Sequence, residues 1–239
     1  MKEEHTVRSY DEELSHLTNL IARMGGLAEA QLEGAVQALM RRDSDLAGKV
    51  IAADAKVDEI EHEVHSFTVR LLALRQPVAH DLRQIVGALK ISGDIERIAD
   101  YAANVAKRAL VLNQIPPVKP MAGVPRLARL VQEVVKEVLD AYIEQDEGKA
   151  LAVWRQDEEV DALYNGLFRE LITYMMEDPR NITACIHLMF IAKNIERIGD
   201  HATNIAENIY FLVKGDAIPD ARPKGNTILP YPSDLTEDE

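Results

Sequence analysis

Apolar residues recur three and four positions apart along most of the chain, which is the period of an amphipathic helix. The periodic stretches are 14–28, 50–67, 91–109, 127–138, 153–167 and 191–212. No comparable stretch alternates strictly between apolar and polar residues, as a half-buried strand would. The pattern therefore predicts six long helices and an all-α fold.

A proline-rich stretch divides these helices into two groups of three. Pro116, Pro117, Pro120 and Pro125 fall between the third and fourth periodic stretches, and proline cannot continue a helix interior because it lacks the backbone N–H. Short turns between long helices favour antiparallel neighbours within each group. The expected organisation is a first three-helix bundle at 1–115, a linker at 116–125, a second three-helix bundle at 126–214 and a flexible acidic tail at 215–239.

The two predicted bundles also resemble each other in sequence. Residues 91–106 recur as 191–206, with nine of sixteen positions identical. Asp54 and Asp58 recur as Asp157 and Asp161 at an offset of 103. The simplest architecture is two tandem three-helix bundles related by internal duplication.

The duplicated window carries a pair of acids in each copy. Glu96 and Asp100, like Glu196 and Asp200, are four residues apart, so each pair shares one helix face. They point roughly 165–180° away from the apolar face, so we expect them on the outside of the bundles. Like charges at this spacing cost about 0.2–0.5 kcal/mol in an isolated helix. A bound cation or a partner protein would compensate.

Each preceding helix offers a second acidic pair that could flank the first. Four carboxylates from two helices form an oxygen-only site suited to magnesium, manganese, calcium or iron ions. The candidate metal ligands are Glu96, Asp100, Glu196, Asp200, Asp54, Asp58, Asp157 and Asp161. The simpler alternative is a metal-free surface on which Arg97 and Arg197 neutralise the neighbouring acids.

Composition narrows the functional classes. The 239 residues include 40 acidic and 27 basic ones, a formal charge of −13, which argues against a nucleic-acid partner. The single cysteine, Cys185, excludes an intramolecular disulfide and fits a reducing compartment. No uncharged apolar run reaches the length of a membrane span. We expect a soluble cytoplasmic protein without membrane insertion and, in the absence of a Gly-x-Ser-x-Gly elbow or phosphate-binding loop, without catalytic or cofactor-binding residues.

The acidic segments 96–100 and 194–202 resemble a signature that occurs twice in phosphate-transport-system regulatory proteins, the PhoU family. The signature is Glu or Asp, three residues, then Asp. The likeness extends over roughly residues 5–215. It implies a pair of three-helix bundles, commonly a homodimer, with metal clusters at the acidic signatures in some members.

The resemblance also implies a function. The family regulates phosphate uptake and phosphate-starvation gene expression negatively in the cytoplasm, through contacts with the ATPase subunit of the phosphate transporter and with a membrane-bound sensor histidine kinase. Glu96, Asp100, Glu196 and Asp200 match the signature itself, and the four aspartates match acids on the preceding helix. The copies differ, since Ala99 and Tyr101 stand where the second has Gly199 and His201, which predicts a more crowded first site.

These observations favour a non-enzymatic signalling adapter whose acidic faces, bare or metal-loaded, bind partner proteins. Two alternatives remain at this point. One is a carboxylate-bridged metalloenzyme, and the other is a metal-free structural helical adapter.

Overall fold

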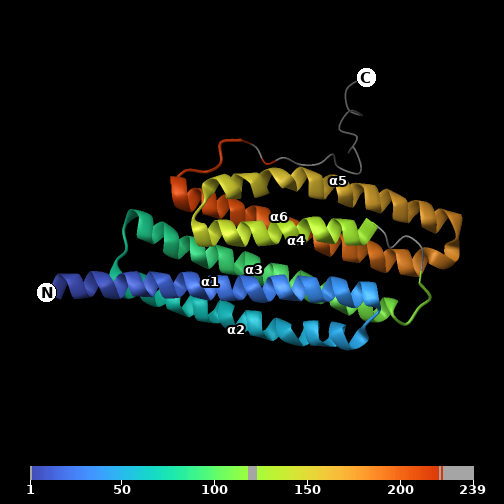
Figure 1. The fold of residues 1–239 in the computed structure, drawn as a ribbon, viewed down its shortest axis with the longest axis horizontal. Helices are drawn as coiled ribbons and strands as arrows, with labels where there is room; N and C mark the ends of the chain where they lie inside the picture. The colour runs from blue at the N-terminus through green and yellow to red at the C-terminus, as the bar shows by residue number, and fades with distance from the viewer. Residues whose placement is uncertain (1, 118–122, 221, 223–239) are drawn as a thin grey trace, which may run out of the picture.

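The computed structural model describes residues 2–117, 123–220 and 222 (Figure 1). Within these residues the chain forms six α-helices, one short 3₁₀ turn and no strand, which confirms the all-α prediction. The elements are α1 (Lys2–Arg41), α2 (Ser44–Arg75), α3 (Ala79–Leu112), α4 (Gly123–Glu144), α5 (Glu147–Glu177), η2 (Pro179–Asn181) and α6 (Ile182–Lys214).

The predicted linker at 116–125 overlaps the start of α4. Residues 118–122 lie outside the described residues, whereas 123–125 belong to the first turn of that helix. Pro125 is tolerated there because the first backbone N–H groups of a helix have no partner within the helix.

The duplication extends to the turns that begin the second helix of each bundle. Asp43 and Asp146, equivalent residues 103 positions apart, cap α2 and α5 by accepting hydrogen bonds from first-turn backbone N–H groups. The residues before them, Arg42 and Gln145, both adopt left-handed backbone conformations, with φ of 55° and 52°. Because the caps and the turn conformations match, both bundles fold back at the same point of the repeat.

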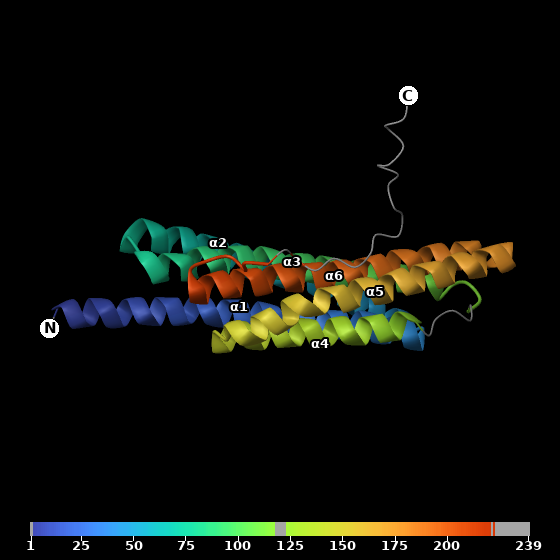
Figure 2. The ribbon, with the colours of Figure 1, turned by 90° about the horizontal axis from the view of Figure 1, so that it is seen from above.

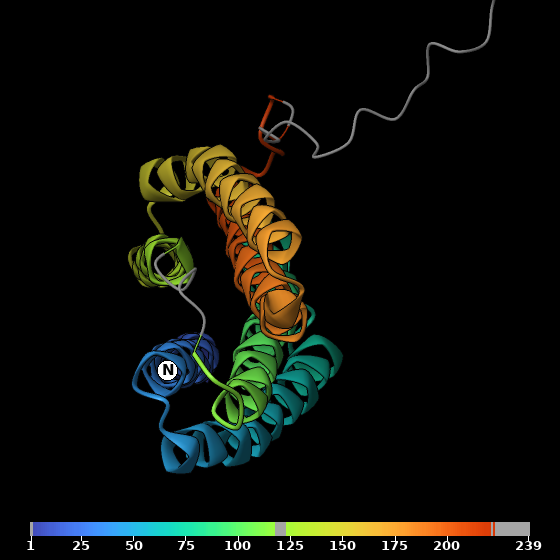
Figure 3. The same cartoon turned by 90° about the vertical axis from the view of Figure 1, so that its right-hand side faces the viewer.

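The two bundles join along their third helices. α1, α2 and α3 pack together, as do α4, α5 and α6, and the most extensive contact of all is between α3 and α6. Viewed end-on (Figure 3), α2, α3, α6 and α5 form one curved layer, with α1 and α4 against one side of it. The view from above (Figure 2) shows the same two layers. The duplicated acidic window therefore lies at the centre of the molecule in both copies.

The core follows the predicted apolar positions. Ile95 and Ile98 on α3, and their counterparts Ile195 and Ile198 on α6, are at most 1% exposed. Their burial removes large apolar side chains from water and supplies the main driving force for folding. Cys185 is also buried, as its place in the apolar pattern predicts.

Small residues allow close approach between the bundles. A Cβ atom at Gly87 of α3 would lie 2.7 Å from Leu212 Cδ2 of α6, and one at Gly25 of α1 would lie 2.5 Å from Leu139 Cδ2 of α4. Glycine at these two positions gives the facing leucines the space they occupy. Among the described residues, no helix is both long enough and apolar enough to cross a membrane.

Candidate functional site

The first acidic site lies between α2 and α3, where Asp54, Asp58, Glu96 and Asp100 come together. Burial raises the pKa of Asp54, and the charges of Asp100 and Asp58 raise it further, against a hydrogen bond from Gln31. Burial likewise raises the pKa of Glu96, followed by the charges of Asp100 and Asp58, while Arg97 acts in the opposite direction. The two helices therefore bring the four predicted carboxylates into one electrostatic cluster.

Compensation within this first site is weak. Arg97 Nη1 lies 3.1 Å from Asp100 Oδ2, and its Nε lies 3.4 Å from Glu96 Oε2, but the arginine side chain is 57% exposed. Gln31 of α1 donates to Asp54 over a long 3.4 Å. Because exposed ion pairs contribute little in water, the first site keeps most of its negative field.

The second acidic site lies between α5 and α6 and forms a pocket of about 430 Å³. Its lining residues are Asp157, Asp161, Glu196, Asp200, His201, Asn204 and Arg222. Two of its acids are buried, since Asp157 is 5% exposed and Glu196 is 7% exposed. Glu196 was predicted to project from the outer face of its bundle, and this prediction is wrong. A projection of α6 alone does not include α5, which packs against α6 and forms the other side of the pocket.

The buried acids of the second site have close partners. Lys193 Nζ lies 2.6 Å from the Glu196 carboxylate. Burial raises the pKa of Glu196, and the lysine opposes this effect. Thr203 Oγ1 donates to Asp157 Oδ1 over 3.0 Å. Neither Lys193 nor Thr203 has an equivalent in the first repeat, where Gly93 and Ala103 stand, so their contribution is specific to the second site.

Arg222 is the functional residue that sequence reasoning missed. It follows the helical repeat, in the segment expected to be a solvated tail, yet its guanidinium hydrogen bonds to Asp157, Asp200 and Asn204. The side chain is 22% exposed. A single arginine in a proline-containing polar segment carries no local signal for docking. The available sequence signal is its position, since Arg222 is a basic residue close enough along the chain to reach the acids of α6.

Tyr101 and His201 occupy equivalent positions of the two repeats and meet where α3 packs on α6. The rings of Tyr101 and His201 stack with centroids 5.7 Å apart, and His201 Nδ1 lies 2.8 Å from Asp94 Oδ1. Arg197 Nη1 donates to the Tyr101 hydroxyl over 3.3 Å. The hydrogen bond to Tyr101 raises the pKa of Arg197, and the charges of Glu196 and Asp200 raise it further, so Arg197 partly offsets these acids. Tyr101 and His201 form part of the junction between α3 and α6.

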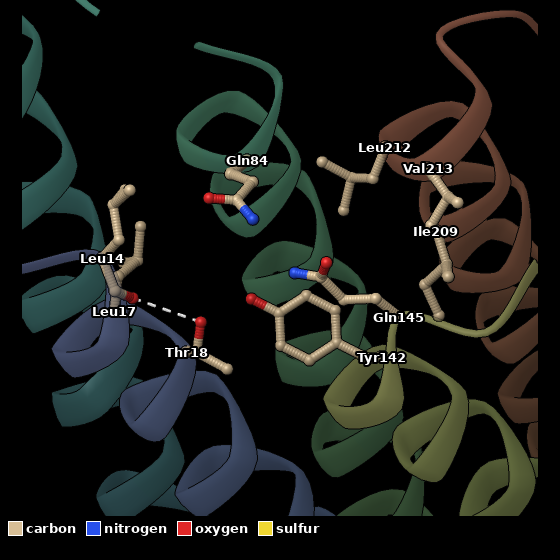
Figure 4. A pocket seen from close by; sticks show the side chains of 9 residues that line it. All are labelled: Leu14, Leu17, Thr18, Gln84, Tyr142, Gln145, Ile209, Leu212 and Val213. Carbon is tan, nitrogen blue, oxygen red and sulfur yellow. Dashed lines mark hydrogen bonds between the residues drawn. The ribbon is translucent and has the colours of Figure 1, made fainter. Parts of the chain in front are cut away.

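A small pocket lies away from the acids. It is a space of only about 20 Å³ among α1, α3, α4 and α6, and Figure 4 shows Tyr142 pointing into it from α4. The ring of residues around it is mostly apolar, and burial raises the pKa of Tyr142 to about 12. Because this volume holds at most a single water molecule, it is a packing defect rather than a ligand site.

The carboxylates are of the right chemical kind for a hard cation, but their spacing is not that of a coordination sphere. Within the described part of the chain, no group of three or more His, Cys, Asp or Glu side chains is placed to hold one metal ion. The eight predicted ligands are therefore assembled as two clusters that do not fit a metal in this arrangement. Their role as ligands stays a prediction that requires side chains to rearrange.

Comparison with known proteins gives a consistent picture. A family model described as the PhoU domain matches residues 21–109 and 124–209. The chain is 53% identical over 222 residues to the phosphate-specific transport system accessory protein PhoU homolog of Caulobacter vibrioides, covering 92% of this chain and 96% of that protein. It is 48% identical over 225 residues to the homolog of Zymomonas mobilis, covering 94% of each.

Two crystal structures share the architecture. PhoU from Pseudomonas aeruginosa has a TM-score of 0.85 and 41% sequence identity, covering 87% of this chain and 100% of that one. The phosphate transport system regulatory protein PhoU from Streptococcus pneumoniae has a TM-score of 0.81 and 26% identity, covering 87% and 99%.

Fold and site together define a class: helical proteins built from two duplicated three-helix bundles, each with an acidic site on its second and third helices. Within that class, the chain belongs to the PhoU family. The relatives are named accessory or regulatory proteins. These names group the chain with accessory and regulatory proteins and not with enzymes.

Proposed function

We propose that this protein is a cytoplasmic negative regulator of phosphate uptake and of the phosphate-starvation response. It acts as an adapter that contacts the ATPase subunit of the phosphate transporter and a sensor histidine kinase. One observation carries the proposal. A relative named as an accessory protein of the phosphate-specific transport system is 53% identical to this chain over 92% of its length. The family resemblance also implies a homodimer, which sedimentation of the purified protein would test.

The first acidic site is the surface best suited to a protein partner. The Glu96 and Asp100 side chains are 25% and 39% exposed, and only the exposed Arg97 compensates them. A partner with a basic surface would be attracted to this field and oriented by it, which affects specificity and association rate more than affinity.

Metal binding is a separate proposal that the adapter function does not require. Asp54, Asp58, Glu96 and Asp100 would hold a hard divalent or iron ion if their side chains moved closer together. Such an ion would supply a positive charge and link α2 to α3. A metal-free adapter is the second candidate, favoured by the cationic groups of Lys193 and Arg222 in the second site. Elemental analysis of untagged protein purified without chelators distinguishes the two.

Partner binding can be tested with neutral, nearly isosteric substitutions. We expect the double variant Glu96→Gln/Asp100→Asn to bind the purified transporter ATPase subunit and the cytoplasmic part of the kinase at least about tenfold more weakly, or roughly 1.4 kcal/mol. The matched control is Glu158→Gln/Glu159→Gln, which removes two exposed charges from α5. Unchanged binding by the first variant would reject the docking site.

The regulatory role itself is tested in cells. A strain without the gene should express a phosphate-starvation reporter in phosphate-rich medium, and the wild-type chain should repress it again. Continued repression without the gene would reject the regulatory function, whatever the purified proteins do.

A further inference from the structure

The second acidic pocket contains a guanidinium group in a well-formed set of hydrogen bonds. Arg222 Nε donates to Asp157 Oδ2 over 2.9 Å, and Arg222 Nη2 donates to Asp157 Oδ1 over 2.9 Å. These two parallel bonds form the bidentate arrangement in which arginine binds carboxylates most specifically. The carboxylate that receives them is 5% exposed, so solvent screens the pair weakly.

Two further acceptors on α6 complete the pocket. Arg222 Nη2 donates to Asp200 Oδ1 over 2.9 Å, and Arg222 Nη1 donates to Asn204 Oδ1 over 3.1 Å. Asp200 and Asn204 are one helical turn apart on the same face. The guanidinium thus lies between α5 and α6, and each of its three nitrogens has an acceptor.

The path of the chain makes this contact possible. Gly215 ends α6 with φ of 83°, and residues 215–220 turn back along the helix (Figure 2). Asn204 precedes Lys214 by ten residues, or about 15 Å of helix. The eight residues from Lys214 to Arg222 span up to about 26 Å when extended. The segment is therefore long enough to reach the pocket without strain.

A metal ion and Arg222 would need the same oxygen atoms. Asp157 and Asp200 are both predicted metal ligands, and in the structure both accept hydrogen bonds from the guanidinium. The planar fork of arginine suits the separation of these acceptors across two helices, whereas an ion would need them closer together. The absence of any described group of three potential ligands around one point agrees with this difference.

We propose that the second acidic pocket is an arginine site, with Arg222 of the same chain as its resident ligand. The inference goes beyond the regulatory function and does not depend on it, because it concerns only what the pocket binds.

Chemical rescue tests the proposal. Arg222→Ala should lower the melting temperature by about 2–4 °C, and millimolar N-ethylguanidinium should restore most of that loss. The wild type should not respond, because its pocket is occupied. Ethylammonium, a compact charge without a planar fork, should restore much less.

The matched control is Arg180→Ala. Arg180 makes the same kind of bidentate contact, with Asp178, but its side chain is 89% exposed and is not among the residues that line the pockets described above. Neither compound should therefore raise the melting temperature of this variant. In Arg222→Ala/Asp157→Asn, which lacks the buried carboxylate, N-ethylguanidinium should have no effect. Circular dichroism confirms that each variant keeps its helices.

Two results would overturn the arginine site. One is an Arg222→Ala protein that melts with the wild type and gains nothing from N-ethylguanidinium. The other is equal rescue by ethylammonium, which would indicate a general acidic surface. Because this assay uses only the purified chain, its failure is distinguishable from failure of the regulatory function in the cell reporter.

Discussion

The two acidic sites carry the same carboxylates on the same helices of the repeat, yet they differ in how those carboxylates are neutralised. In the first, Arg97 forms the ion pairs and is 57% exposed, and the charge of Lys107 acts on Asp54 as well. In the second, Arg222 and Lys193 pair with acids that are almost fully buried. Duplication therefore preserved the acidic groups, while Lys193, at a position where the copies differ, and Arg222, beyond the repeat, determined their environment.

The largest difference between the sites should appear when the equivalent aspartates are removed. Asp157→Ala removes the bidentate acceptor of Arg222 and one acceptor of Thr203, so we expect a loss of about 2–3 kcal/mol of unfolding free energy. Asp54→Ala loses only a long hydrogen bond from Gln31 and should cost less than about 1 kcal/mol. Urea unfolding of both variants measures this. Equal losses would contradict the comparison.

The next largest difference between the two sites should appear in the coupling free energy of their arginine–aspartate pairs. A double-mutant cycle on Arg222 and Asp157 should give roughly 1–2 kcal/mol of coupling, because the carboxylate is buried. The same cycle on Arg97 and Asp100 should give less than about 0.5 kcal/mol. Repeating both cycles in about 0.5 M salt should abolish the second coupling and leave most of the first, since salt screens exposed charges more strongly.

The pH dependence of the unfolding free energy tests the raised pKa of Glu96 in the first site. The folded state raises the pKa of Glu96, so the folded protein holds this proton more tightly than the unfolded chain does. Stability contributed by this group is therefore present below the ordinary glutamate pKa and falls as pH rises through the raised value. We expect Glu96→Gln to exceed the wild type by less than about 1 kcal/mol at pH 7, and the difference to shrink toward pH 4. A difference that grows on acidification would contradict the assigned direction.

The smallest expected change in stability comes from the residue before the second acid of each signature, which is Ala99 in one copy and Gly199 in the other. A Cβ atom at 199 would lie 3.1 Å from Val160 Cγ1. Gly199→Ala gains about 1 kcal/mol of helix propensity but compresses the stiff Val160 side chain at a similar cost. Thermal unfolding should show a net change within about 0.5 kcal/mol. A gain of the full helix propensity would mean that the second site has room to spare.

Much of the fold followed from local patterns. The apolar period predicted every α-helix of the described chain, since helix period depends on neighbours three and four residues apart. The repeat of residues 91–106 at 191–206 placed Glu96, Asp100, Glu196 and Asp200 on equivalent faces. The identity of the acids in each site was predictable for the same reason.

Other features of the sites depended on segments distant in sequence. The exposure of Glu196 was predicted wrongly because a helical projection contains one helix and no neighbours. Lys193 and Thr203 fall at positions where the repeats differ, so repetition could not assign them a role. Arg222 lies outside the repeat altogether.

By itself, the sequence determined six helices, their duplication and a set of paired carboxylates, because each of these depends on residues within a few turns of one another. Tertiary structure alone decided which carboxylates are buried, that Tyr101 meets His201, and that Arg222 occupies the second acidic site and not the first. The physical reason is that burial and ion pairing depend on which distant segments approach, and that approach is set by the packing of α3 on α6 and the return of the chain beyond Gly215.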